Sequence, residues 1–271
     1  MHPVDIKSDA ATLVSRPPLP AGNDRQWAWF LDVDGTLLEI ETRPDLVLAD
    51  PRLLRLLQRL QQAYDGAVAL VSGRSLLQLE AIFNPLALPA GASHGLELKL
   101  PDGSVRRAGP AVPARYAERI SAFAERHDGL IFEQKPLSIG VHYRDRPELA
   151  QQLLALMEPV CAELGAGFRL MHGKMVLELL PTAADKGRAI ESFMELPPFA
   201  GRRPVFVGDD LTDEDGFAVV NALGGLSVRV GHAADSGARW QLSNVSDVRA
   251  WLRAAVAAPN GTSARDEQKN D

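Results

Sequence analysis

Two aspartates follow a short apolar run near the start of the chain. Residues 27–31, Trp-Ala-Trp-Phe-Leu, are apolar without interruption, and Asp32 and Asp34 come directly after them, with Gly35 next. Such a run is typical of a strand buried on both faces of a parallel sheet, and open α/β sheets bind ligands at the carboxyl ends of these strands. Buried neighbouring acids repel each other unless a cation or hydrogen bonds offset the charge. The pattern favours a metal site, and an Asp-Gly turn capped by a second Asp is the simpler alternative.

Three further segments add polar side chains at comparable positions. One apolar run ends at Ser72, Gly73 and Arg74, and another ends at Asp209 and Asp210. A predicted helix between them begins at Lys186. In a parallel sheet the strand ends lie along one edge, whatever their separation in sequence. Carboxylates suit Mg²⁺, and a hydroxyl with a cation suits an anionic substrate. Together they favour phosphoryl transfer, although each alone fits a turn, a solvated lysine or a helix N-terminus.

The elements around these residues alternate between strand and helix. Asp50-Pro51 begins a helix, the run 67–71 predicts a second strand, and a further helix passes through Phe83. The same alternation resumes at Lys186 and continues to Val256. This order predicts an α/β fold whose core is a Rossmann-like, doubly wound parallel sheet with right-handed crossovers.

The pattern changes between residues 101 and 181. Helices are expected near 112–123 and 147–164, and strands at 130–134, 138–144, 168–172 and 175–180. The order α-β-β-α-β-β predicts an inserted α+β cap domain with one sheet and two helices on one face. The predicted organisation is therefore a flexible N-terminal lead 1–26, a catalytic core of 27–100 and 182–257, a cap of 101–181, and a disordered tail 258–271.

Composition argues against several classes of function. The 271 residues are 46% hydrophobic and 24% charged, which is ordinary for a globular protein. A net charge of -6 without a basic block argues against nucleic acid as a partner, and no apolar run approaches the ~18 residues of a membrane span. The single cysteine, Cys161, excludes an intrachain disulfide. We expect a cytoplasmic protein, a monomer rather than an oligomer, with a small-molecule substrate.

Taken together, the motifs resemble those of the haloacid dehalogenase-type phosphatases. The matching segments are DVDGT at 32–36, VSGR at 71–74, the lone Lys186 and GDDLTDE at 208–214. Within that superfamily the chain is similar to the trehalose-6-phosphate phosphatase family, also in the cap, through KPxS at 135–138, VHYR at 141–144 and GKxVxE at 173–178. The resemblance implies Mg²⁺-dependent hydrolysis of trehalose 6-phosphate to trehalose and phosphate.

The resemblance also implies a role for each core residue. Asp32 is the nucleophile that forms an aspartyl-phosphate, and Asp34 protonates the leaving sugar oxygen and then activates water. Mg²⁺ is expected on Asp32, Asp209 and the backbone carbonyl of Asp34. The phosphoryl oxygens are expected on Ser72, Gly73 and Lys186. Support for these groups, without contact to the metal, is expected from Asp210, Asp213 and Arg74.

The cap must recognise the sugar. Lys174 and Glu178 are four residues apart, so we expect them on one face of a strand, joined by Arg144, His142 and Glu133. Each of these could equally belong to a solvated sheet face. Alternative functions are a phosphatase for sucrose phosphate or mannosyl-3-phosphoglycerate, a phosphomannomutase, and an inactive sugar-phosphate-binding regulator, against which the intact Asp32 and Asp34 argue.

Overall fold

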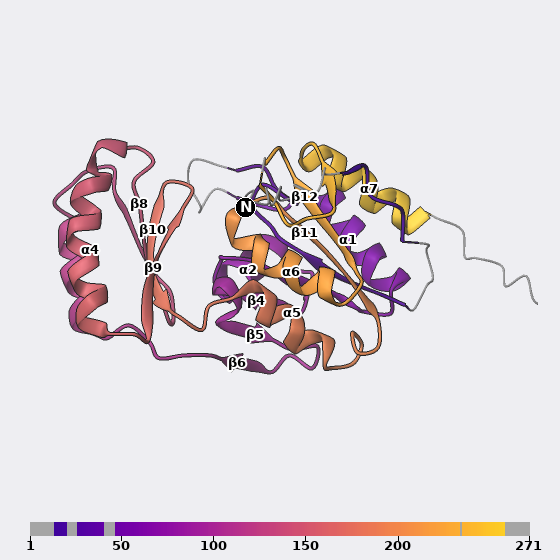
Figure 1. Ribbon diagram of the computed structural model, residues 1–271, viewed down its shortest axis with the longest axis horizontal. Helices are drawn as coiled ribbons and strands as arrows, with labels where there is room; N and C mark the ends of the chain where they lie inside the picture. The colour runs from indigo at the N-terminus through magenta and orange to yellow at the C-terminus, as the bar shows by residue number, and fades with distance from the viewer. Residues whose placement is uncertain (1–13, 21–25, 41–46, 234, 258–271) are drawn as a thin grey trace, which may run out of the picture.

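A computed structural model of the chain describes residues 14–20, 26–40, 47–233 and 235–257. These residues form a larger body around a nine-stranded sheet and a smaller body around a four-stranded sheet (Figure 1). In spatial order the larger sheet contains β1 (Val14–Ser15), β13 (Trp240–Leu242), β12 (Leu226–Val230), β11 (Arg203–Gly208), β2 (Trp27–Leu31), β3 (Val68–Val71), β4 (Ala90–Ala92), β5 (Glu97–Lys99) and β6 (Val105–Arg107). Neighbours from β1 to β4 are parallel, and β5 and β6 are antiparallel additions.

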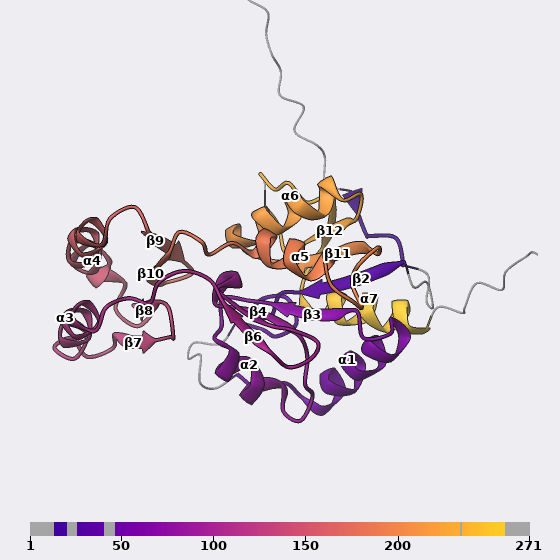
Figure 2. The ribbon, with the colours of Figure 1, turned by 90° about the horizontal axis from the view of Figure 1, so that it is seen from below.

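Helices cover both faces of the larger sheet. One face packs against α1 (Pro51–Ala63), α2 (Leu76–Phe83) and α7 (Val245–Ala257), and the other against α5 (Lys186–Met194) and α6 (Glu214–Ala222). Figure 2 shows α5 and α6 on the opposite side of the strands from α1 and α7. Within β2, Trp29 belongs to the first apolar cluster and Phe30 to the second, because successive side chains of a strand point to opposite faces. The doubly wound α/β fold expected from the uninterrupted apolar run is confirmed.

The smaller body has the predicted α-β-β-α-β-β order. It consists of α3 (Ala114–Ala124), β7 (Ile131–Gln134), β8 (Ile139–His142), a short 3₁₀ turn (Pro147–Leu149), α4 (Ala150–Leu164), β9 (Phe168–Gly173) and β10 (Val176–Pro181). The strands are antiparallel in the order β7-β8-β10-β9. Both helices pack on one face of this sheet, where Ile120, Met157 and Val141 belong to one buried cluster. The other face of the sheet is turned toward the larger body (Figure 2).

Two expected boundaries change. The expected start of the insert, residue 101, falls within the β5–β6 hairpin, which pairs with β4 and extends the core sheet, so the insert starts after Arg107. Part of the expected flexible lead also belongs to the core: β1 pairs with β13, and the buried Tyr64 hydroxyl donates a hydrogen bond of 3.0 Å to the carbonyl of Pro20. The rest of the lead, 1–13 and 21–25, and the expected tail 258–271 lie outside the described residues.

None of the described helices has both the length and the apolar character needed to cross a membrane.

Helix α6 approaches the sheet closely at Gly216. A Cβ atom built on Gly216 would lie 2.4 Å from Cε1 of Phe206, so this contact leaves no room for a methyl group. Alanine normally favours a helix over glycine by up to about 1 kcal/mol, yet overpacking a core typically costs about 1–3 kcal/mol. We therefore expect Gly216→Ala to lower the free energy of unfolding, measured by urea denaturation.

The control for this prediction is Gly167→Ala, where a Cβ atom would meet nothing within 4 Å. That variant should unfold at the midpoint of the wild type. A midpoint for Gly216→Ala at or above the wild-type value would contradict the close contact with Phe206.

Candidate active site

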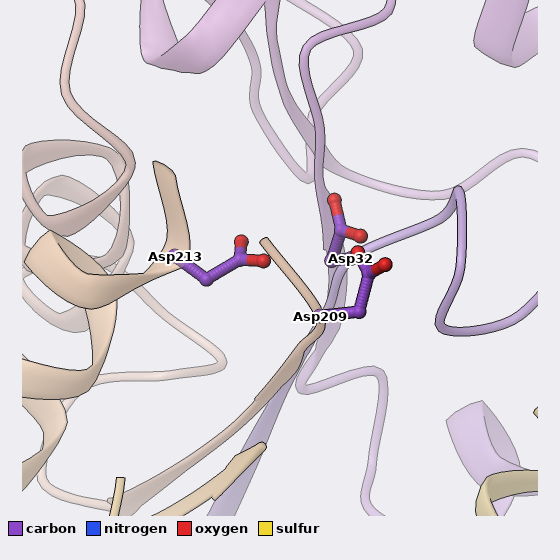
Figure 3. Close-up of side chains that lie close together, drawn as sticks. All are labelled: Asp32, Asp209 and Asp213. Carbon is purple, nitrogen blue, oxygen red and sulfur yellow. The ribbon is translucent and has the colours of Figure 1, made fainter. Parts of the chain in front are cut away.

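The carboxyl ends of three neighbouring core strands meet, as predicted. Asp32 follows β2, Ser72 follows β3 and Asp209 follows β11. The pairing register places Leu31 of β2 opposite both Val207 and Leu70, so the three polar residues lie at one edge of the sheet. Figure 3 shows the carboxylates of Asp32 and Asp209 beside each other at these strand ends, with Asp213 entering from the turn before α6.

The turn after β2 depends on Gly35. Its φ of 78° is in the left-handed region that favours glycine, and a Cβ atom there would overlap the Asp209 carboxylate, 1.9 Å from Oδ2. Backbone amides in the turn close it, since the amides of Leu37 and Leu38 donate to the carbonyl of Val33. The absence of a side chain at Gly35 thus lets the backbone after Asp34 lie directly against the carboxylate of Asp209, at the end of β11.

Lys186 lies between two buried carboxylates. Its Nζ donates to Asp32 Oδ1 at 2.8 Å and to Asp213 Oδ1 at 2.6 Å, and its side chain is 3% exposed. Burial would lower the pKa of Lys186, but Asp213 and Asp32 outweigh this effect and raise it, so the ammonium stays charged. We call Asp32, Lys186, Asp209 and Asp213 the charge cluster.

The charge cluster has an excess of negative charge. Burial raises the pKa of Asp32 well above its usual range and exceeds the opposing effect of Lys186, while Asp213 and Asp209 raise it further. Burial also raises the pKa of Asp209. One carboxylate oxygen from each of Asp32, Asp209 and Asp213 lies within 4.8 Å of the other two. An all-oxygen set with uncompensated charge fits a hard divalent cation such as Mg²⁺.

The side chains of Asp34 and Asp210 form hydrogen bonds with residues outside the charge cluster. Arg74 donates from Nε to Asp34 Oδ2 and from a terminal nitrogen to Oδ1, both at 2.7 Å, which fixes the plane of the Asp34 carboxylate. Asp210 accepts from the amide of Leu211 and begins the turn that contains Asp213. Asp213, expected only as a supporting group, is fully buried and stands with Asp32 and Asp209.

A cavity of about 190 Å³ extends from the charge cluster to the cap. All of the site residues predicted from the sequence line this cavity except Asp213, which is fully buried. From the core the lining includes Asp32, Asp34, Ser72, Gly73, Arg74, Lys186, Asp209 and Asp210, and from the cap Glu133, His142, Arg144, Lys174 and Glu178. The structure therefore brings the phosphate-binding and sugar-binding candidates to one cavity.

Glu178 is the buried carboxylate at the cap side of the cavity. Its Oε1 accepts from Lys135 Nζ at 2.9 Å and from the Ser138 hydroxyl at 2.7 Å. Burial would raise the pKa of Glu178, but Lys135 and then His94 outweigh this and hold it far below the usual range. Glu133, next in the cap, accepts from Gln78 of the core at 2.6 Å and contacts His142 Nε2 at 2.9 Å.

Lys174 departs from the expectation that it shares a strand face with Glu178. It lies in the turn between β9 and β10, where Met175 has a φ of 63°, so strand alternation does not apply to it. From this turn its Nζ forms an ion pair with Asp209 Oδ2 of the core. The backbone carbonyl of Lys174 accepts from Arg144 at 3.3 Å.

Among the wall residues that the sequence did not predict are the polar side chains of Lys135, Gln78 and His94. Lys135 was visible in the KPxS segment, and its role follows from donating both to Glu178 and to the carbonyl of Gly73, at 2.9 Å each. Gln78 shows no signal beyond its place at the start of a helix. His94 gives none, because its position depends on a left-handed backbone that sequence patterns do not reveal.

The sequence is similar to those of trehalose phosphatases. The sequence profile of the trehalose-phosphatase family matches residues 30–247. The trehalose-6-phosphate phosphatase of Escherichia coli (strain K12) is 39% identical over 248 residues, 91% of each chain, and a probable trehalose-phosphate phosphatase of Sinorhizobium fredii is 42% identical over 207 residues, 76% of this chain and 78% of the other.

Solved structures show the same architecture. A crystal structure of a trehalose-6-phosphate phosphatase related protein matches with a TM-score of 0.73 and 26% identity, over 84% of this chain and 96% of that one. A haloacid dehalogenase-like hydrolase from Bacteroides thetaiotaomicron matches with a TM-score of 0.60 over 83% of this chain and 98% of that one, and at 16% identity it shows the fold alone.

The doubly wound core with its inserted α+β body has the fold of haloacid dehalogenase-like hydrolases. The family profile and the relatives also identify the family. The chain belongs to the trehalose-phosphatase family, and it is a phosphatase.

The burial of His94 predicts a pH dependence of stability. Burial lowers its pKa from the usual 6.5 and outweighs the opposing effect of Glu178. Below about pH 6.5 the unfolded chain therefore binds a proton that the folded protein does not, so the free energy of unfolding falls as the pH falls through this window. In His94→Gln the loss between about pH 7 and about pH 5, measured by urea denaturation, should be smaller.

His172→Gln, at an exposed position of the cap, is the matched control for removing one imidazole. An identical loss of stability in His94→Gln and the wild type would contradict a neutral, buried His94.

Proposed function

We propose that this phosphatase hydrolyses trehalose 6-phosphate to trehalose and phosphate, with Mg²⁺ and through an aspartyl-phosphate, as a step in trehalose biosynthesis. The observation that supports this best is a single cavity with a buried charge cluster on the core side and the ionised Glu178 on the cap side. The relatives named as trehalose-6-phosphate phosphatases, one of them matched over 91% of both chains, favour this sugar.

In the proposed reaction the core residues act on the phosphoryl group. An oxygen of Asp32 attacks phosphorus and displaces the sugar oxygen, and Ser72, Gly73 and Lys186 bind the phosphoryl oxygens. Lys186, already paired with Asp32, offsets negative charge at the attacked centre. Mg²⁺, held by Asp32, Asp209 and the Asp34 carbonyl or by the closely placed Asp213, would neutralise part of the phosphoryl charge.

Asp34 acts as the proton carrier. It protonates the leaving sugar oxygen, and its carboxylate then takes a proton from the water that hydrolyses the aspartyl-phosphate. Arg74 donates to both oxygens of Asp34, and a protonated carboxyl group keeps lone pairs that accept hydrogen bonds. Arg74 therefore fixes the position of the Asp34 side chain while its proton is exchanged.

The proposal predicts fast phosphate release from trehalose 6-phosphate. Release should stop with EDTA, return with Mg²⁺, and fall by at least about 1,000-fold in Asp32→Asn, since the amide cannot act as the nucleophile. The measurement is free phosphate over a set of sugar phosphates that includes sucrose phosphate, mannosyl-3-phosphoglycerate and mannose phosphates.

Each alternative has its own outcome in this screen. Faster turnover of sucrose phosphate or mannosyl-3-phosphoglycerate would assign that substrate instead. Labelled phosphate retained on sugar would indicate a phosphomannomutase, and binding without turnover a regulator. The screen tests neither the predicted cytoplasmic location nor the predicted monomeric state.

Glu178 should decide the sugar, because a site that binds hydroxyls loses about 1–3 kcal/mol for each buried polar group left without its partner. We expect Glu178→Ala to lower kcat/KM for trehalose 6-phosphate by at least ~10-fold, and to change turnover of p-nitrophenyl phosphate little. Lys174→Ala should lower both rates, since Lys174 also contacts Asp209.

Glu163→Ala is the matched control in the cap. Glu163 lies on α4, half exposed and paired with Arg119, and should leave both rates unchanged. Unchanged trehalose 6-phosphate turnover in Glu178→Ala would show that the sugar is recognised elsewhere.

A further inference from the structure

His94 is the core residue that touches the cap carboxylate Glu178. Its Nε2 lies 3.4 Å from Glu178 Oε2, whereas Lys135 and Ser138 both contact the other oxygen, Oε1. Lys135 and Ser138 belong to the cap, as Glu178 does. Within the part of the chain that the structure describes, His94 is the polar side chain placed at Oε2. Both oxygens of Glu178 are thus held, one by the cap and one by the core.

The backbone at His94 is built for this position. Ser93, His94 and Gly95 have φ values of 48°, 57° and 87°, a run of left-handed residues that costs energy for the two that are not glycine. The turn is fixed to the catalytic loops on both sides: the amide of His94 donates to the carbonyl of Ser72 at 2.9 Å, and the amide of Asp185 donates to the carbonyl of His94 at 2.7 Å. A displacement of this turn would therefore also displace Ser72 and the start of α5.

The imidazole also lies against Gly73. A Cβ atom on Gly73 would come within 2.6 Å of Cε1 and Nε2 of His94, so glycine at this position makes room for the ring. The carbonyl of the same Gly73 accepts from Lys135 of the cap. The glycine of the phosphate-binding loop, the histidine ring and the two cap residues Lys135 and Glu178 therefore form one contiguous set of contacts between core and cap.

We propose that His94 is a positioning residue that orients Glu178 for sugar recognition when the cap lies on the core. The proposal rests on the function proposed above, because it concerns how Glu178 meets trehalose 6-phosphate. Glu178 is buried, and without His94 its Oε2 would lose the polar group that faces it, so the carboxylate would be held at Oε1 alone. Asp32, Asp209, Asp213 and Lys186 would keep the partners described above, whereas the contact of the ring with Gly73 would be lost.

The test compares two substitutions at one position. His94→Asn suits a left-handed backbone but is too short to reach Glu178, whereas His94→Gln can place an amide nitrogen near the position of Nε2. We expect His94→Asn to raise KM and lower kcat/KM for trehalose 6-phosphate about 10-fold, with His94→Gln restoring most of the loss. Turnover of p-nitrophenyl phosphate should fall much less than that of trehalose 6-phosphate in His94→Asn, because this small substrate does not need Glu178.

A double-mutant cycle with Glu178→Gln shows whether His94 acts through Glu178. If it does, His94→Asn has little further effect on trehalose 6-phosphate in the Glu178→Gln background. Additive losses, an equal fall with both substrates, or no fall in His94→Asn would each overturn the proposal. Failure of the wild type to hydrolyse trehalose 6-phosphate would instead overturn the proposed function, so the two failures are distinguishable.

Discussion

The burial of Lys186 between Asp32 and Asp213 is the interaction on which the rest of the site depends. The three side chains come from the end of β2, the start of α5 and the turn before α6, and Lys186 is 154 residues from Asp32. Removal of one partner from an ion pair buried this deeply strongly destabilises the folded protein, because an uncompensated charge remains. The cluster therefore fixes the relative positions of three elements, and its excess negative charge fits a divalent cation at the same point.

Much of the core could be predicted because its information is local. The uninterrupted apolar run of β2, the Asp50-Pro51 helix start and the α-β-β-α-β-β order of the insert each follow from short patterns, and the structure confirms the resulting elements. The meeting of Asp32 with Asp209 also follows, since parallel strands place their carboxyl ends at one edge. Topology thus turns four separate motifs into one site without any knowledge of side-chain packing.

The remaining features depend on tertiary contacts that short patterns do not contain. The expected boundary at 101 misses β6 because an exposed three-residue strand has no apolar alternation to reveal it. Strand alternation placed Lys174 on a strand face, whereas a left-handed Met175 makes it part of a turn. His94 is invisible for the same reason. Backbone conformations with positive φ at non-glycine residues are set by their surroundings, and three of them, at Ser93, His94 and Met175, lie where the core meets the cap.

The two halves of the cavity use charge differently, and this explains why they must be connected. In the core, carboxylates outnumber the ammonium group, so the charge cluster favours a cation and, with it, an anionic substrate group. In the cap, Glu178 is matched by Lys135 and is held ionised, so it can accept hydrogen bonds from neutral hydroxyls without attracting a metal. A sugar phosphate, the substrate proposed above, would meet both at once. Contacts from Gly73 to Lys135 and from His94 to Glu178 set the separation of the two halves, and the distance between the phosphate and the sugar hydroxyls of the proposed substrate would have to match it.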